Sequence, residues 1–235
     1  YVQSPVCGAS RMSFYTGRYV SSHGASWNGF PLKVGEWTIG DYLRPLGVRT
    51  ALVGKTHMEP DAEGMARLGI DPQSIIGVHV SECGFETYER DDGLRAEGPE
   101  EDSETPYMTR RAMDFIAEAG DARWCLHLSY IKPHWPYVAP APYNTMYSSA
   151  DLIPFVRSDD ERRDAHPVFR EFMEHRVGRN FSRDEVRDEV VPVYMGLIKQ
   201  IDDQLGELFA FLEKRGLFDN TMIVFTSDHG DYLGD

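Results

Sequence analysis

A reactive side chain and a cation lie close together near the start of the chain, within Cys7–Arg11, where the sequence is Cys-Gly-Ala-Ser-Arg. No Pro or Gly follows until Gly17, a common helix stop, so a short helix beginning near Cys7 is predicted. Free N–H groups and the helix dipole favour an anion there, and a cysteine in that position is more reactive than a buried one. Arg11, one turn later, could direct its guanidinium to the same anion. We therefore expect a nucleophile beside an anion-binding group.

Other nucleophile motifs fit this run less well. The tyrosine-phosphatase loop has Cys and Arg six positions apart, but the residue six beyond Cys7 is Ser13. The elbow of α/β-hydrolases requires G-x-S-x-G, and Gly8–Met12 lacks the final glycine. A structural cysteine in a turn of small residues remains an alternative that these five positions alone do not exclude.

A lysine and a histidine could act together in the segment Gly54-Lys55-Thr56-His57. Lys55 and His57 are two positions apart, so they share a face if the segment is extended. Lys55 could supply fixed charge, and His57 a proton or hydrogen bond. An exposed pair of loop residues is the alternative interpretation.

A third candidate is His134, which stands between Pro133 and Pro136 in the sequence Pro-His-Trp-Pro. Closely spaced prolines force an extended and rigid path, which would hold the imidazole in a fixed direction. The alternative is a plain proline-rich connector.

Adjacent metal-binding side chains, Asp228 and His229, occur in the run Ser-Asp-His-Gly-Asp that ends at Asp231. Both can turn toward a divalent ion, because Gly230 allows a sharp exit of the chain. A carboxylate beside an imidazole suits Ca²⁺ or Mn²⁺ without choosing between them. The alternative is a turn with a side-chain cap, and we interpret Asp231 as such a cap.

Apolar runs that lead into the last three motifs predict core strands at 48–53, 124–130 and 222–226. Open α/β sheets place their chemistry at the carboxyl ends of their strands. Helices are predicted over 36–46, 108–119 and 185–215. Pro192 would end or kink the last helix early. His127, inside the second apolar run, is interpreted as a core or edge histidine whose polar atoms are satisfied.

Composition limits the classes of function. The 235 residues, 41% of them hydrophobic, can bury a substantial core in one domain. A formal net charge of −14 argues against nucleic acid and anionic membranes as partners, and no apolar run could span a bilayer. Three cysteines give neither a disulfide framework nor a zinc spacing. No signal peptide is visible, which leaves the location open and favours the cytoplasm.

The four motifs C-x-A-x-R, G-K-x-H, P-H-x-P and S-D-H-G-D occur here in the order that is typical of one family. Together they resemble the type I sulfatases and the related phosphonate monoester hydrolases of the alkaline phosphatase superfamily. Ala9 stands where proline is commoner in that family. The resemblance implies an α/β fold with a central, mostly parallel sheet flanked by helices. It also implies that residues 1–235 form a single sulfatase-type catalytic domain truncated at both ends.

The same resemblance implies a chemistry for the motif residues. Cys7 would be oxidised to formylglycine by a formylglycine-generating enzyme, and its hydrate would be the nucleophile. Cys7, Asp228 and His229 would hold a divalent metal, Ca²⁺ first and Mn²⁺ second. In that family further acidic ligands lie upstream of the nucleophile, and a sulfate-binding lysine lies downstream of the S-D-H-G-D run.

The remaining roles follow from the same motifs. Arg11 and Lys55 would hold the nucleophile and the sulfate, and Lys55, His134 and Asn28 would bind substrate. His57 would orient or deprotonate the hydrate, and His134 would protonate the leaving group.

Three functions stay open at this point. The first is hydrolysis of small-molecule sulfate esters, favoured by Lys55 and His57. The second is hydrolysis of phosphonate monoesters or phosphodiesters, which the region from Cys7 to Asn28 resembles. The third is a non-catalytic relative that keeps the fold as a binding module. A homo-oligomer is compatible with each of them.

Overall fold

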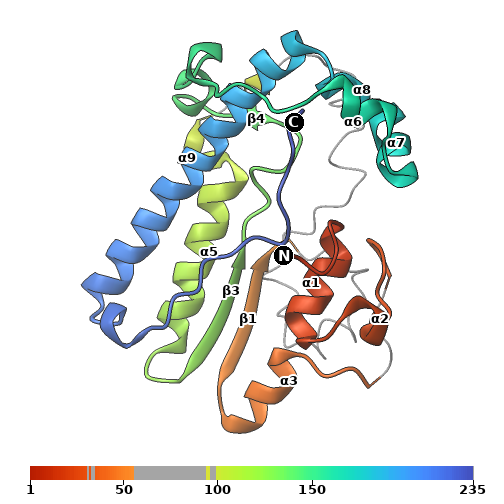
Figure 1. Cartoon of the computed structure of the whole chain (residues 1–235). Coiled ribbons are helices and arrows are strands. Elements are labelled where there is room, and N and C mark those ends of the chain that lie inside the picture. The colour runs from red at the N-terminus through yellow and green to blue at the C-terminus, as the bar shows by residue number, and fades with distance from the viewer. Residues whose placement is uncertain (31, 33–34, 56–93, 96–98, 235) are drawn as a thin grey trace. The chain divides into compact units, whose positions relative to one another are not determined.

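The computed structural model describes residues 1–235 except 31, 33–34, 56–93, 96–98 and 235 (Figure 1). The chain divides into two compact units. The first comprises residues 1–78, 104–131 and 204–230, and the second comprises residues 79–103, 132–203 and 231–235.

In the first unit, helix α1 (Cys7–Thr16) begins at the cysteine itself. Val6 precedes it in an extended conformation, with φ −100° and ψ 126°. The helix ends at Gly17, whose left-handed φ of 67° lets its N–H return to the carbonyl of Ser13. The predicted helix start at Cys7 is confirmed. A short helix, α2 (Val20–His23), follows.

Strands β1 (Arg49–Gly54) and β3 (Trp124–Ser129) form a parallel pair in this unit, as two of the predicted strands require. Helix α5 (Glu104–Ala119) precedes β3 and covers one face of the pair (Figure 1). The register runs from Arg49 opposite Trp124 to Gly54 opposite Ser129. Both strands therefore end together at their carboxyl edge, where Lys55 follows β1.

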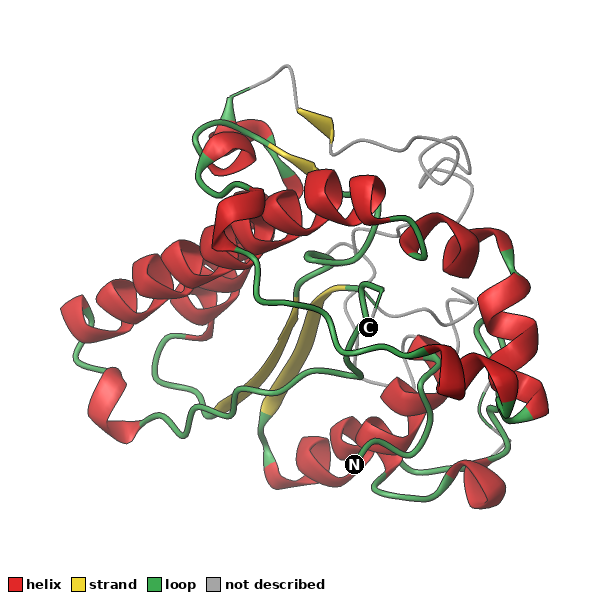
Figure 2. Cartoon of the chain, turned by 45° about the horizontal axis from the view of Figure 1, so that its top comes forward, coloured by secondary structure: helices red, strands yellow, loops and turns green. Residues whose placement is uncertain are grey.

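Side chains of successive residues in β1 enter cores on opposite faces of the sheet. Leu52 packs in a cluster with Met12 and Tyr15 of α1. Val53 packs with Met108 of α5. Helices α1 and α5 thus cover the two faces, which gives the layered α/β arrangement (Figure 2).

Helix α9 (Asp184–Lys214) continues through Pro192, so of the two predicted effects of this proline, an end or a kink, the early end is wrong. Its last turns complete the α5 side of the first unit, where Leu208 and Leu212 pack with Ile116. In the second unit the same helix packs through Val193 and Leu197 against a cluster that includes Tyr143.

The described residues of the second unit also form the short parallel strands β2 and β4 and three short α-helices. These elements are β2 (Leu94–Arg95), β4 (Val138–Ala139), α6 (Asp159–Arg163), α7 (Pro167–Glu174) and α8 (Arg176–Phe181). Among the described residues of both units, no helix has the length and apolar character needed to cross a membrane.

Two sequence predictions are corrected. Residues 222–226, predicted as a third core strand, pair with no described strand, and Met222 and Phe225 are 89% and 81% exposed. An apolar run becomes a strand only when a neighbour accepts its backbone hydrogen bonds. The helix predicted over 36–46 is shorter, because α3 spans Ile39–Leu43 and a 3₁₀ turn spans Arg44–Leu46.

Candidate active site

The start of α1 is capped by a residue from a distant loop. The backbone N–H of Gly8 donates to Oδ1 of Asn28 at 2.7 Å, while Val6 gives no side-chain cap. A Cβ on residue 8 would lie 2.9 Å from that same oxygen and 3.0 Å from the carbonyl oxygen of Trp27. Glycine is therefore required here. This contact places Asn28, which is predicted to bind substrate, beside Gly8, the residue that follows Cys7.

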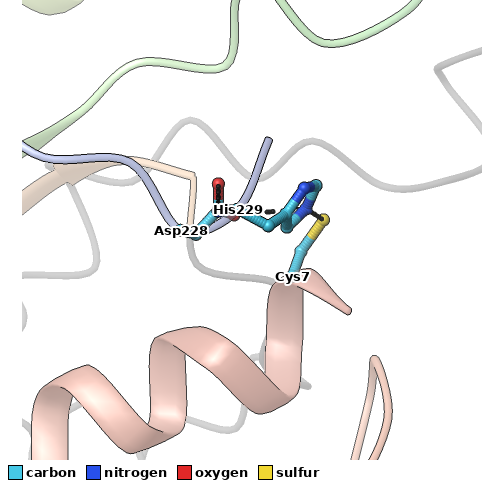
Figure 3. Close-up of side chains that lie close together, drawn as sticks. All are labelled: Cys7, Asp228 and His229. Atoms are coloured by element: carbon cyan, nitrogen blue, oxygen red, sulfur yellow. Dashed lines mark hydrogen bonds and ion pairs between the residues drawn. The ribbon is translucent and has the colours of Figure 1, made fainter. Parts of the chain in front are cut away.

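Cys7 faces His229, which lies 222 residues later in the chain (Figure 3). The distance from Sγ to Nε2 is 3.0 Å. The other ring nitrogen, Nδ1, lies 2.8 Å from the carbonyl oxygen of Gly230. Since a carbonyl only accepts, Nδ1 carries a proton and Nε2 is the atom turned to the sulfur. Hydrogen bonding to Cys7 raises the pKa of His229 to about 9, against the effect of burial.

Asp228 completes this cluster, and its ligand atom lies within 4.8 Å of those of Cys7 and His229 (Figure 3). Its Oδ1 accepts the backbone N–H of His229 at 3.1 Å, and the hydroxyl of Ser10 donates to its carbonyl oxygen at 2.5 Å. Burial works against the ionised form, but the charges of Arg11 and His229 hold the pKa of Asp228 below its ordinary value.

Arg11 is buried, and its guanidinium is held on two sides. Nε and Nη2 lie 3.0 and 2.9 Å from Oδ2 of Asp228. Nη1 donates to the carbonyl oxygen of Lys55 at 3.0 Å and to Oγ of Ser129 at 2.5 Å. Most of the N–H groups of Arg11 thus bind other parts of the protein. Its main role in this arrangement is to fix the carboxylate of Asp228, in addition to offering positive charge to an anion.

Lys55 is 4% exposed, and its Nζ lies 3.7 Å from Sγ of Cys7. Burial lowers the pKa of the ammonium, while the neighbouring Cys7 opposes that shift. Gly54 makes the placement possible, because its φ is 107° and a Cβ there would lie 2.1 Å from the carbonyl oxygen of Ser129. The predicted meeting of Lys55 with Cys7 and Arg11 is therefore present in the structure.

Two further residues of the site, Ser129 and Ser10, were not predicted from the sequence. Both hydroxyls contact the side chains or backbone of predicted site residues. A signal for Ser129 exists in the sequence, since it is a polar residue near the end of the second apolar run, as Lys55 lies just after the first.

Of the other predicted residues, His57 lies outside the described part of the chain. His134 belongs to the second unit, where its Nδ1 lies 2.6 Å from the carbonyl oxygen of Trp135. Asp231 accepts from the backbone N–H of Leu233 at 3.3 Å, as expected of a turn cap. His127 lies in β3, but its buried Nδ1 has no hydrogen-bond partner among the described residues, so the expectation that it is satisfied is wrong.

The donor set of Cys7, Asp228 and His229 fits a divalent cation. A histidine that ligates a metal commonly donates its other N–H to a backbone carbonyl, as Nδ1 of His229 does toward Gly230. The ionised carboxylate adds a hard oxygen. Residue 7 would contribute a sulfur ligand as the encoded cysteine thiol, or an oxygen ligand after oxidation to formylglycine. Beside this set, the buried charges of Arg11 and Lys55 can stabilise an anion.

Comparisons with known proteins identify the family of this chain. The family whose description is Sulfatase matches residues 1–235 of the chain. The multifunctional alkaline phosphatase superfamily protein PehA of Trinickia caryophylli is 32% identical over 276 residues, covering 97% of this chain and 54% of that protein. The choline-sulfatase of Rhizobium meliloti is 27% identical over 265 residues, covering 100% of this chain and 50% of that protein. The chain spans about half the length of the curated relatives it matches.

Solved structures support the α/β fold. The phosphonate monoester hydrolase of Agrobacterium radiobacter superposes with a TM-score of 0.83 at 22% identity, covering 100% of this chain and 55% of that one. The phosphonate monoester hydrolase of Silicibacter pomeroyi gives a TM-score of 0.77 at 29% identity, covering 97% and 54%. The predicted α/β fold of the alkaline phosphatase type is confirmed.

Proposed function

The chain belongs to the sulfatase family, and from that premise we propose that this protein hydrolyses small-molecule sulfate esters. One observation carries the proposal. The buried ammonium of Lys55 lies 3.7 Å from Sγ of Cys7, close enough for it to contact a sulfate group under attack from position 7. A lysine at this point of the motif order is typical of sulfatases.

The nucleophile is proposed to come from Cys7. After conversion to formylglycine by a formylglycine-generating enzyme, the hydrate would supply the hydroxyl that attacks sulfur. Asp228, His229 and the modified Cys7 would hold a divalent cation, Ca²⁺ or Mn²⁺. Such an ion lowers the pKa of a bound hydroxyl and neutralises developing negative charge.

The side chains of the first unit supply the electrostatics. Lys55 would contact the transferred sulfate, and its buried charge needs no reorganisation during the reaction. Arg11 would keep Asp228 ionised and oriented. Asn28, whose Oδ1 is fixed by the N–H of Gly8, would turn its amide nitrogen toward a sulfate oxygen.

Proton transfers are assigned to two histidines. The carbonyl oxygen of Trp135 holds the N–H at Nδ1 of His134, so in the protonated imidazolium Nε2 would donate its proton to the departing ester oxygen. His57 would remove the proton whose loss expels sulfate and regenerates the aldehyde.

Hydrolysis of phosphonate monoesters is the second candidate. It is favoured by the 29% identity and the TM-score of 0.77 with the hydrolase of Silicibacter pomeroyi. The same nucleophile could attack phosphorus while the same cations stabilise the negative charge, since both reactions occur at a tetrahedral anionic centre.

A rate comparison separates these candidates. The full-length protein is produced with a formylglycine-generating enzyme and assayed on an aryl sulfate and an aryl phosphonate monoester that share one leaving group. We expect the larger kcat/KM on the sulfate. Cys7→Ala should abolish turnover of both, while the matched change Cys125→Ala, on β3, should retain it. A larger kcat/KM on the phosphonate, or activity that survives Cys7→Ala, would overturn the proposal.

A further inference from the structure

We propose that Ser129 is a positioning residue that holds the guanidinium of Arg11, so that Arg11 orients Asp228 beside Cys7 and His229. The inference rests on the proposed function for its kinetic consequence. The geometry on which it stands belongs entirely to the first unit.

Three hydrogen bonds define the arrangement. The hydroxyl of Ser129 donates to the carbonyl oxygen of Lys55 at 2.9 Å. Because that single proton is used, its oxygen can only accept from Nη1 of Arg11, which lies 2.5 Å away. The same Nη1 also reaches the carbonyl oxygen of Lys55 at 3.0 Å. These groups form a closed triangle of main chain, hydroxyl and guanidinium.

The parallel register fixes Ser129 in this position. Ser129 lies opposite Gly54, and its carbonyl oxygen accepts the N–H of Lys55 at 2.9 Å. Backbone and side chain of Ser129 thus hold the turn that carries Lys55. All the groups are buried, with Ser129 5%, Lys55 4% and Arg11 8% exposed, so water does not readily replace a lost partner.

The planar guanidinium transmits this constraint to the metal-binding cluster. Nη1 is tied to the Ser129 side, and Nε and Nη2 lie 3.0 and 2.9 Å from Oδ2 of Asp228. Rotation at one edge of the rigid fork would displace the other. Partners that orient a metal ligand in this way commonly change metal affinity or activity by about 10- to 100-fold when removed.

The test compares four full-length, converted proteins: wild type, Ser129→Ala, Arg11→Lys and the double variant. Two quantities are measured, kcat/KM on the aryl sulfate and the dissociation constant for Mn²⁺ from the spin-resonance signal of free Mn²⁺. We expect Ser129→Ala to weaken both by about tenfold in the wild-type background, the lower end of the range for a direct partner because Ser129 acts through Arg11, and by less than about twofold in the Arg11→Lys background. Equal effects in both backgrounds, or no effect in either, would overturn the proposal.

Ser13→Ala is the matched control for loss of a buried serine hydroxyl. Ser13 is 8% exposed and its Oγ lies 2.9 Å from Nε2 of His23, away from the Asp228 contacts. Ser13→Ala should lower thermal stability and leave Mn²⁺ binding unchanged.

If wild type hydrolyses neither ester, the proposed function fails, and the crystal structure of Ser129→Ala then tests the positioning role by itself. A guanidinium displaced from Asp228 supports the positioning role, and an unmoved one refutes it.

Discussion

The imidazole of His229 presents Nε2 to Sγ of Cys7 at 3.0 Å, although the two residues are 222 positions apart in the chain. The N–H on the opposite side of the ring is held by the carbonyl oxygen of Gly230. Together with Asp228, the encoded thiol makes a sulfur, nitrogen and oxygen donor set. Conversion of Cys7 would replace the soft sulfur with an oxygen, which changes the metals that the site should prefer.

The first prediction concerns this change of donor. Unconverted protein should bind Co²⁺ with a sulfur-to-metal charge-transfer band in the near ultraviolet, because a thiolate would be a direct ligand. Cys7→Ser should lose the band, and Cys125→Ala should keep it. Absorption spectra recorded during Co²⁺ titration check this. A band of equal intensity in Cys7→Ser would show that the sulfur is not a ligand.

The second prediction separates the two roles of Asn28. Its Oδ1 caps the N–H of Gly8, so Asn28→Ala should lower the free energy of unfolding by about 1 kcal/mol, the usual worth of a helix cap. Asn28→Asp keeps an acceptor and places a negative charge at a helix start, so stability should be retained. The added charge should nevertheless lower kcat/KM for an anionic substrate at least about tenfold. Denaturant unfolding and sulfatase assays on both variants check this, and full activity in Asn28→Asp would exclude contact with the anion.

The sequence allowed prediction of β1, β3 and the start of α1, because each depends on a local pattern of apolar runs and stop residues. Among the polar residues expected at the ends of those strands, Lys55 lies near Cys7 as predicted, with Nζ 3.7 Å from Sγ. Ser129 could not be assigned its contacts, because they depend on the register of two strands whose paired residues are far apart in sequence.

The predicted strand at 222–226 failed for a related reason. Its apolar composition is that of a buried strand, but the described sheet offers it no pairing partner, and Phe225 is 81% exposed. Composition gives the capacity to form a strand, and a neighbouring backbone decides whether one forms. The hydrogen bond from Nδ1 of His229 to the carbonyl oxygen of Gly230 could not be predicted from the sequence either, because it depends on the rotation of the imidazole ring.

The third prediction concerns two glycines in one helix, α9. A Cβ at Gly196 would lie 2.1 Å from the carbonyl oxygen of Tyr143, whereas a Cβ at Gly206 would meet nothing within 4 Å. Gly206→Ala should therefore raise the free energy of unfolding by about 0.5–1 kcal/mol through helix propensity. Gly196→Ala should lower it by more than about 1 kcal/mol, because the helix must move away from the 3₁₀ turn that spans Tyr143–Thr145. Denaturant unfolding of both variants checks this, and stabilisation by both would contradict the packing of Gly196.

The fourth prediction concerns His127, which packs edge-on against Phe14 and Tyr15, with ring centroids 5.2 and 5.4 Å away. Burial, followed by the charge of Arg11, lowers its pKa to about 4 from the ordinary 6.5. The unfolded chain therefore binds a proton more readily than the folded one between these values. The stability due to neutral His127 is fully present above pH 6.5 and is lost as the pH falls toward 4, with a slope of at most about 1.4 kcal/mol per pH unit.

In His127→Phe, which keeps an aromatic ring, this part of the loss of stability in acid should disappear. His175→Gln, which removes an exposed histidine, should show the wild-type loss. Unfolding free energies from pH 7 to pH 4 check this, and identical acid profiles for wild type and His127→Phe would show that His127 titrates as an ordinary histidine.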